Sequence, residues 1–226
     1  MEYIMQNMKL DTRTTNILKN FSSINPSLLF TPGSTLKTQS PTSSILATAT
    51  ITQSFDSQFA IYELSRLLGV MSLFKEPELQ IDEKFLVIKD SNGQKRVKYT
   101  FTDPSNIIAP KADVKVRMPE TLAEVKVTSD VLNDVLRAAA LLKHPDVAFI
   151  GQDGQLTLST IDSSKKSKDT YDITIGTTEH TFQVIFKLET LKLLPGDYDV
   201  TVAKGLAFWK GEDVEYYTGA ESNSSF

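Results

Sequence analysis

The chain has 226 residues, of which 40% are hydrophobic and 23% charged, a composition typical of a globular protein with two modest domains or one large all-β domain. It contains no cysteine, which excludes disulfides and thiolate metal sites, and it shows neither a signal peptide nor an apolar run near the ~20 residues that span a bilayer. The net charge of −4 argues weakly against nucleic-acid binding, although the placement of charge matters more than its sum.

The first half of the chain predicts two amphipathic helices and a hairpin. Apolar side chains recur at helical spacing over residues 9–24, and Pro26 lies where it cannot extend the helix. Residues 62–75 show the same spacing, although Gly69 lowers the helix propensity by about 1 kcal/mol relative to alanine. Strands are predicted at 46–52, 85–89 and 96–101, and an Asn-Gly turn joins the last two.

The second half predicts two further helices among hairpin strands. The segment 103–111 has a proline near each end and no periodicity, so it is the predicted linker. One helix covers 129–143, capped by Thr128 or Ser129, and a short one covers 187–193. Extended segments are predicted at 114–117, 123–127, 147–150, 156–161, 170–175, 180–186, 198–202, 206–210 and 214–217. The fold class is therefore α+β with antiparallel sheets.

Three short matches between the halves indicate an internal duplication. Residues 15–20 match 133–138, residues 61–67 match 185–191, and residues 97–99 match 214–216, at offsets of 118, 124 and 117. A repeat of this length exceeds the roughly 20–50 residues of solenoid units. The matches predict two similar domains, and chance likeness between apolar helices is the alternative.

The sequence offers little catalytic chemistry. Its two histidines, His144 and His180, lie far apart and in no metal-ligand spacing, so surface or packing roles are expected. No phosphate-binding Gly-Lys-Ser/Thr loop, dinucleotide fingerprint or Gly-x-Ser-x-Gly elbow is present. We expect no enzyme activity, no cofactor and no metal. An enzyme using scattered carboxylates is a minor alternative.

Charge is distributed unevenly along the chain. The predicted helices and their flanks carry ten positive and five negative charges, a net of +5, which leaves −9 for the remainder. The negative residues are Asp11, Glu63, Asp130, Asp134 and Glu189. The positive residues are Lys9, Arg13, Lys19, Arg66, Lys75, Lys126, Arg137, Lys143, Lys187 and Lys192. Unless this arises by chance, the helices share a face toward a polyanion. The pattern suits loose, sequence-independent contact with a duplex backbone.

Several segments, in order, resemble the DNA polymerase sliding clamps of T-even-type bacteriophages. The resemblance begins at Met8-Lys9-Leu10 and runs to the C-terminus. Residues 1–7 have no counterpart, so an N-terminal extension without order, or an alternative start, is expected. The remaining matches are Leu18-Lys19-Asn20-Phe21, Ile24-Asn25, Ala60-Ile61-Tyr62, Leu64, Leu68-Gly69, Ser72-Leu73, Asp103-Pro104-Ser105, Ala109-Pro110, Pro195-Gly196, Tyr198 and Ala203-Lys204-Gly205.

The resemblance implies a DNA-clamp fold with domains at 8–110 and 111–226. It implies a ring of three identical subunits around double-stranded DNA, with helices lining the hole and sheets forming the outer wall. It also implies two protein partners, the C-terminal tail of the polymerase and an ATP-driven clamp loader, in the cytoplasm of an infected bacterium. A non-enzymatic phage assembly protein that oligomerises through the duplicated domain is the alternative.

Site residues follow from the charge pattern and the resemblance together. Ile107 and Ile108, adjacent apolar residues on the connector, are the expected partner site, or else a small satellite core. Lys165, Lys166 and Lys168 lie in a polar loop that is expected either to be solvated or to touch DNA. Lys19 and Arg137 occupy matching positions and are expected to face one hole. The expected DNA-facing residues are Lys9, Arg13, Lys19, Arg66, Lys126, Arg137, Lys143, Lys187 and Lys192.

Overall fold

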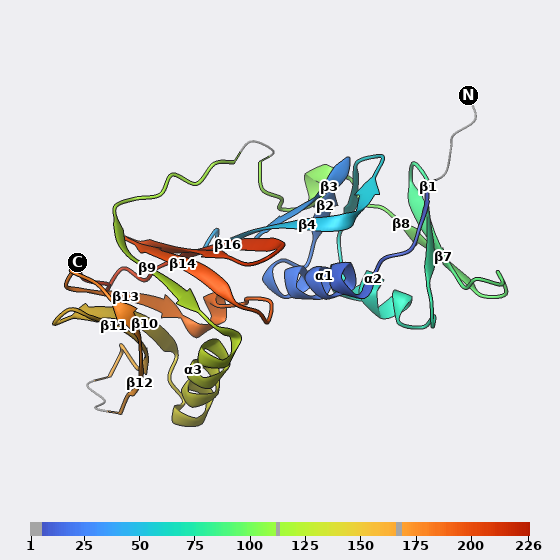
Figure 1. The fold of residues 1–226 in the computed structure, drawn as a ribbon. Coiled ribbons are helices and arrows are strands. Elements are labelled where there is room, and N and C mark those ends of the chain that lie inside the picture. Colours follow the sequence, from blue (N-terminus) through green and yellow to red (C-terminus); the bar gives the residue numbers. More distant parts are fainter. Residues whose placement is uncertain (1–5, 112–113, 166–168) are drawn as a thin grey trace. The chain divides into compact units, whose positions relative to one another are not determined.

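The computed structural model describes residues 6–111, 114–165 and 169–226, and it forms two compact units (Figure 1). The N-terminal unit comprises residues 1–41 and 47–112, and the C-terminal unit comprises residues 42–46 and 113–226. The expected division at 110/111 did not anticipate that residues 42–46 group with the C-terminal unit.

Three α-helices occur in the described part of the chain: α1 (Thr12–Ile24), α2 (Leu64–Met71) and α3 (Ser129–Leu142). The prediction of a helix at 187–193 is wrong, because only a single 3₁₀ turn, η2 (Leu188–Thr190), forms there. Pro195 follows too closely for a longer helix, and a short segment gains too few hydrogen bonds to offset the cost of nucleation. A second 3₁₀ turn, η1 (Pro104–Asn106), lies on the connector.

The N-terminal unit contains one four-stranded antiparallel sheet in the order β1-β6-β7-β8. Residues 6 and 7 belong to β1 and align with Ile81 and Gln80, so the expectation of disorder is wrong for them; residues 1–5 lie outside the described part. In addition, β2 pairs with β5, and β3 with β4. The bounds are β1 (Gln6–Met8), β2 (Leu28–Phe30), β3 (Gly33–Gln39), β4 (Ile45–Phe55), β5 (Phe59–Ile61), β6 (Glu78–Ile81), β7 (Phe85–Lys89) and β8 (Arg96–Thr100).

The C-terminal unit contains two sets of four antiparallel strands, in the orders β12-β11-β10-β13 and β9-β14-β15-β16. The segment expected to be extended at 114–117 forms no strand. The bounds are β9 (Thr121–Val127), β10 (Asp146–Gln152), β11 (Gln155–Ile161), β12 (Tyr171–Thr177), β13 (Phe182–Lys187), β14 (Tyr198–Ala203), β15 (Leu206–Lys210) and β16 (Val214–Gly219).

The two units repeat one topology, which confirms the internal duplication. In each unit the first strand joins the last three in one sheet, and a helix follows that first strand. The pair β2/β5 corresponds to β10/β13, and β3/β4 corresponds to β11/β12. All three sequence matches fall on equivalent elements: α1 with α3, the β5–α2 junction with the β13–η2 junction, and β8 with β16.

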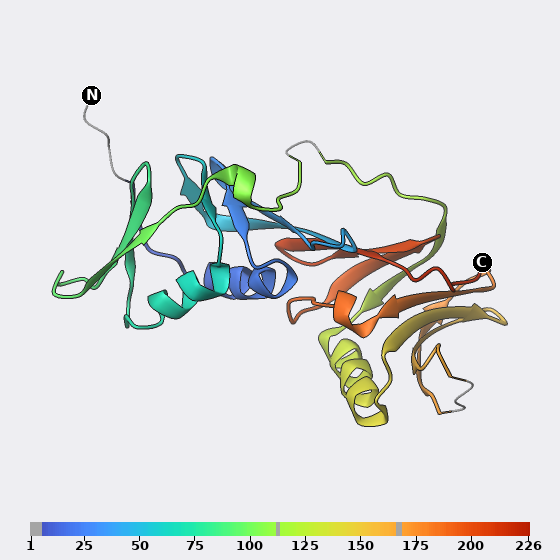
Figure 2. The ribbon, with the colours of Figure 1, turned by 180° about the vertical axis from the view of Figure 1, so that it is seen from behind.

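Each unit buries its own core. In the N-terminal unit, α1 buries Ile17, Leu18 and Phe21 and contacts α2 and β3. In the C-terminal unit, α3 contacts β10, β11 and β12. The ring centroid of the fully buried Trp209 on β15 lies 5.7 Å from that of Phe149 on β10, which links the two sheets. These contacts orient the helices, so that the polar side of each one faces solvent. Figure 2 shows α1 and α2 next to each other in the N-terminal unit.

Candidate nucleic-acid interface and connector site

Helix α1 begins at a strong cap. The Asp11 carboxylate accepts a hydrogen bond of 2.6 Å from the backbone N–H of Thr14 and one of 2.5 Å from the Thr52 hydroxyl. The hydrogen bond from Thr52, followed by that from Thr14, lowers the pKa of Asp11 to about 2. The carboxylate is therefore charged at neutral pH, where it also complements the positive end of the helix dipole.

The solvent-facing side of α1 is basic and otherwise uncharged. Arg13 and Lys19 are both exposed, and residues 12–24 include no acidic residue. The neutral polar residues around them were not singled out from the sequence, although the absence of acidic residues over 12–24 was readable there. The neutral polar residues are Thr12, Thr15, Asn16, Asn20, Ser22 and Ser23. The hydroxyls of Thr15, Ser22 and Ser23 donate to the backbone oxygens of Asp11, Lys19 and Asn20, so these groups keep the helix surface neutral without offering a free proton to a phosphate.

Helix α2 contributes one cation. Arg66 is 72% exposed at its side chain, and its guanidinium lies 3.4 Å from the Glu63 carboxylate, one helical turn away. An exposed pair of this kind contributes little to stability. It still reduces the positive potential at Arg66 relative to Lys19. Lys75, beyond the end of α2, is exposed.

Helix α3 has a mixed outer face. Arg137 is exposed, as are Asp130 and Asp134 on the same side of the helix. Lys143 is the C-cap residue, with a left-handed φ of 56°, and its exposed side chain lies where a cation complements the negative end of the helix dipole. The outer face of α3 is therefore less positive than that of α1.

Lys19 and Arg137 occupy equivalent positions on α1 and α3. Buried residues share the 118-residue offset, since Ile17 corresponds to Val135 and both are buried. Because the buried sides match, Lys19 and Arg137 each lie on the exposed side of their own helix.

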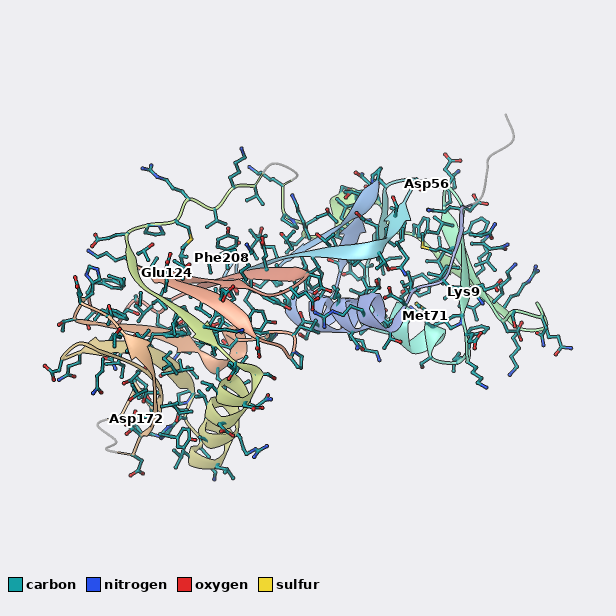
Figure 3. The ribbon with its side chains drawn as sticks, viewed as in Figure 1. Lys9, Asp56, Met71, Glu124, Asp172 and Phe208 are labelled. Atoms are coloured by element: carbon teal, nitrogen blue, oxygen red, sulfur yellow. The ribbon has the colours of Figure 1, made fainter. Side chains whose placement is uncertain are left out.

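Two of the expected DNA-facing lysines lie outside the helices and face acidic groups. The Lys9 ammonium lies 3.2 Å from Glu78 and 3.9 Å from Glu76 beside the N-terminal sheet (Figure 3). Lys126 is on β9, and its ammonium lies 3.7 Å from Asp197. Neither belongs to the basic helix faces. The prediction did not anticipate these acidic neighbours, which come from other segments of the chain.

Lys187 forms an ion pair with a buried carboxylate while its own side chain is 34% exposed, and its expected role at DNA stays a prediction. Its ammonium lies 2.7 Å from the carboxylate of the fully buried Asp146, which also accepts hydrogen bonds from the backbone and hydroxyl of Ser163 at 3.0 and 2.5 Å. Burial alone would raise the pKa of Asp146, but the bonds from Lys187 and Ser163 outweigh it and lower that pKa. The bond to Asp146 in turn raises the pKa of Lys187.

The remaining candidate cations lie in irregular segments. Lys192 is exposed beyond η2, outside any helix. Lys165 forms an ion pair of 3.0 Å with Asp162. Lys166 and Lys168 lie outside the described residues, so their expected role stays a prediction.

The connector is fixed at Ile108 by a buried amide. The Asn25 side chain donates from Nδ2 to the backbone oxygens of Gln39 and Ile108, both at 2.8 Å. The Ile108 side chain is 51% exposed, which argues against the satellite-core alternative for this residue, whereas Ile107 is half-buried. Beside the connector lies a hollow of about 310 Å³ lined by Leu29, Thr31, Thr35, Lys37, Gln58, Ala109 and Pro110.

Metal and membrane features can be assessed for the described residues. No group of three or more potential metal ligands occurs among them. His144 is buried, with Nδ1 2.7 Å from the Thr160 hydroxyl, while His180 is exposed. None of the helices in the described ranges is long and apolar enough to cross a membrane.

A duplicated α+β topology with a basic face on α1 and an exposed connector is typical of a DNA clamp. Residues 9–109 match the family model for a DNA polymerase processivity factor, and residues 124–222 match that for the C-terminal domain of the gp45 sliding clamp. The sliding clamp of Vibrio phage KVP40 is 32% identical over 223 residues, covering 95% of this chain and 100% of that relative. The sliding clamp of Enterobacteria phage T4 is 26% identical, covering 96% and 99%.

Solved structures agree on the fold. The PCNA of Thermococcus kodakaraensis matches with a TM-score of 0.70 at 13% identity, over 95% of this chain and 99% of that one. The A. fulgidus PCNA, solved with the C-terminal region of FEN-1, matches with a TM-score of 0.71 at 12% identity, over 96% and 98%. The chain belongs to the sliding-clamp family of DNA polymerase processivity factors. The protein therefore functions as a sliding clamp and not as a phage assembly protein.

Proposed function

We propose that three copies of the chain close into a ring around duplex DNA and that the chain itself catalyses no reaction. The observation that carries this proposal is the solvent-facing side of α1, where Arg13 and Lys19 stand among neutral polar groups with no acidic residue. Arg66, Arg137 and Lys143 add cations from the other helices, where Glu63, Asp130 and Asp134 offset their charge. Because a closed ring holds DNA by topology, weak contacts with phosphates suffice and do not hinder sliding.

Ring closure requires one surface of each copy to bind a different surface of the next copy. Among the described strands, β8 pairs only with β7, and β12 pairs only with β11, so each leaves one side open. Unpaired strand edges of this kind readily bind another chain. The strands β1, β3 and β9 also end their sheets, and we assign β8 and β12 as the two surfaces that meet between neighbouring copies because of their side chains and charges.

The side chains of these two strands support the assignment. Val97 and Tyr99 on β8, and Ile173 and Ile175 on β12, are only half-buried at the ends of their sheets. A neighbouring sheet placed beside them would complete their burial, at roughly 25 cal/mol per Å² of apolar surface removed from water.

Charge supports the same arrangement. Arg96 and Lys98 are exposed on β8, and Lys98 lines a depression of about 320 Å³ together with Arg66 and its ion-pair partner Glu63. On β12, Asp172 is exposed (Figure 3), as is Asp169 before it. Opposite charges on the two edges favour β8 meeting β12 over either strand meeting its own copy.

The connector is the proposed site for the C-terminal tail of the polymerase. An exposed Ile108 beside a hollow of about 310 Å³ suits an apolar peptide anchor. The sequence lacks a nucleotide-binding motif, which fits opening by a separate ATP-driven loader. The proposed setting is the cytoplasm of the infected host.

Encirclement is tested by topology. Loaded onto nicked circular DNA by its loader, the protein should co-elute with the circle through gel filtration and dissociate after the circle is linearised. Light scattering should give about three times the 25.1 kDa of one chain. Equal retention on circular and linear DNA would overturn encirclement.

A further inference from the structure

The outer edge of β13 is occupied by the C-terminal end of the chain. Gln183 and Ser225 exchange both backbone hydrogen bonds, each at 2.9 Å. The Ile185 oxygen accepts from the Glu221 N–H at 2.7 Å, and the Ile185 N–H donates to the Ser224 hydroxyl at 3.0 Å. The end of the chain lies beside β13 in both ribbon views (Figures 1 and 2). The outward backbone groups of Gln183 and Ile185 are thus satisfied.

This segment, Glu221–Phe226, is here called the strap. A turn in which the Ser224 N–H donates to the Glu221 oxygen at 3.1 Å gives it its shape. Its last residue, Phe226, is 54% exposed beside a hollow of about 450 Å³. The strap is therefore held to β13 by backbone and hydroxyl hydrogen bonds rather than by deep apolar packing.

The two edges of the sheet β12-β11-β10-β13 consequently differ. The strap closes β13, whereas β12 is open. Without the strap, β13 would present an edge rich in strand-forming residues, Phe182, Val184, Ile185 and Phe186, all of them buried in the sheet. Such an edge is a template for pairing with another chain.

We propose that the strap blocks β13 from accepting the β8 edge of another copy, so that β12 is the one open edge of this sheet and the copies close into a ring. This inference rests on the proposed ring. A chain with two acceptor edges would pair in two ways, and the second pairing does not repeat the rotation that closes the ring. Open assemblies of mixed size would result.

The test compares a deletion of residues 221–226 and Ser225→Pro with the full chain. Proline at 225 removes the N–H that donates to Gln183. In both variants we expect the amides of Gln183 and Ile185 to exchange with solvent about tenfold faster or more. Light scattering should then show species heavier than three chains, increasing with concentration. Phe226→Ala is the matched control and should change neither measurement, because that side chain is largely exposed.

Amide exchange and light scattering together distinguish a failure of the strap inference from a failure of the proposed ring. Fast exchange at Gln183 and Ile185 in the full chain would overturn the strap, whatever the oligomer. Lost protection with an unchanged mass distribution would overturn its role in assembly. A full chain that keeps these amides protected but never reaches the mass of three copies would overturn the ring proposal, and the assembly inference with it. Buried Trp209 fluorescence confirms that each variant is folded.

Discussion

At the scale of single residues, the environment of each lysine decides its role. Lys19 is exposed on α1, whereas Lys187 neutralises a buried carboxylate 41 positions away in sequence. Both carry the same charge next to apolar runs, so local sequence could not separate them. A buried ion pair depends on a tertiary contact. The pairing of β10 with β13 aligns Asp146 with Lys187, and the local sequence around Lys187 does not predict this pairing.

Replacing Lys187 by methionine should destabilise the protein by about 2–3 kcal/mol at pH 7, because Asp146 would be left charged and buried without its partner. Urea unfolding followed by Trp209 fluorescence measures this. Lys210→Met, which removes an exposed lysine, should cost less than about 0.5 kcal/mol. Equal effects of the two substitutions would contradict the role of Lys187 in neutralising Asp146.

The ion pair between Lys187 and Asp146 should make the free energy of unfolding depend on pH in the acid range. Because the folded pKa of Asp146 is lowered, its stabilising contribution is present above the ordinary aspartate pKa of about 3.9 and is lost as the pH falls through the folded value. The stability difference between the parent and Lys187→Met should therefore shrink below about pH 4. A difference that stays constant from pH 7 to pH 3 would contradict this.

Ile108 provides a test of the connector site. Ile108→Asp should weaken binding of a fluorescent peptide with the polymerase C-terminal sequence by about tenfold or more, since a charge would replace an apolar anchor. Retention on circular DNA should be unchanged. Leu73→Asp, at another exposed apolar residue of the N-terminal unit, is the control and should leave peptide binding intact.

At the scale of elements, prediction succeeded where the signal was local. The strands at 85–89 and 206–210 and the helix at 129–143 agree with β7, β15 and α3 to within a residue at each end, because alternation, turn residues and caps mark them in the sequence. Prediction failed at η2 and β1. In β1, three residues become a strand only because β6 lies beside them.

The cap of α1 can be tested through pH. Asp11→Ala should cost about 1 kcal/mol at pH 7. The pKa of Asp11 is lowered to about 2, so the contribution of the charge is present above about pH 4 and is lost as the pH falls toward 2. Asp11→Asn keeps a capping acceptor and should lose less stability than alanine. An alanine variant as stable as the parent at pH 7 would refute the cap.

The helix faces can be tested by reversing charge. Lys19→Glu combined with Arg137→Glu should reduce DNA-dependent polymerase stimulation while leaving the oligomer intact. The salt dependence of DNA binding should become shallower by about 0.9 for each phosphate that the protein no longer neutralises. Lys84→Glu with Lys210→Glu makes the same charge change at exposed residues outside the helices. If both pairs act alike, net charge rather than the helix faces is responsible.

At the scale of the whole molecule, the duplication was readable from three weak matches because equivalent elements keep their order. The open strand edges could not be predicted from the sequence, because whether a strand has a neighbour on both sides depends on the complete pairing pattern. The strap on β13 is an example, because the polar sequence of Glu221–Phe226 carries no strand signal. Its pairing arises from backbone groups that any sequence possesses.

The proposed contact between copies is tested on β12. Ile173→Asp places a charge at a half-buried position of the open edge, so the mass at micromolar concentration should fall toward the 25.1 kDa of one chain. Far-UV circular dichroism checks that the fold persists. Thr174→Asp lies on the opposite, exposed face of the same strand and should keep the parent mass. An unchanged mass for Ile173→Asp would exclude β12 from the interface.

The single amide of Asn25 joins two regions with different tasks. It is the C-cap residue of α1, and its Nδ2 bonds the connector at Ile108. A peptide that pulls the connector outward would therefore strain the bond at the end of α1, the helix that we propose to face DNA. We expect tension from a polymerase bound at the proposed connector site to reach α1 through this one buried side chain.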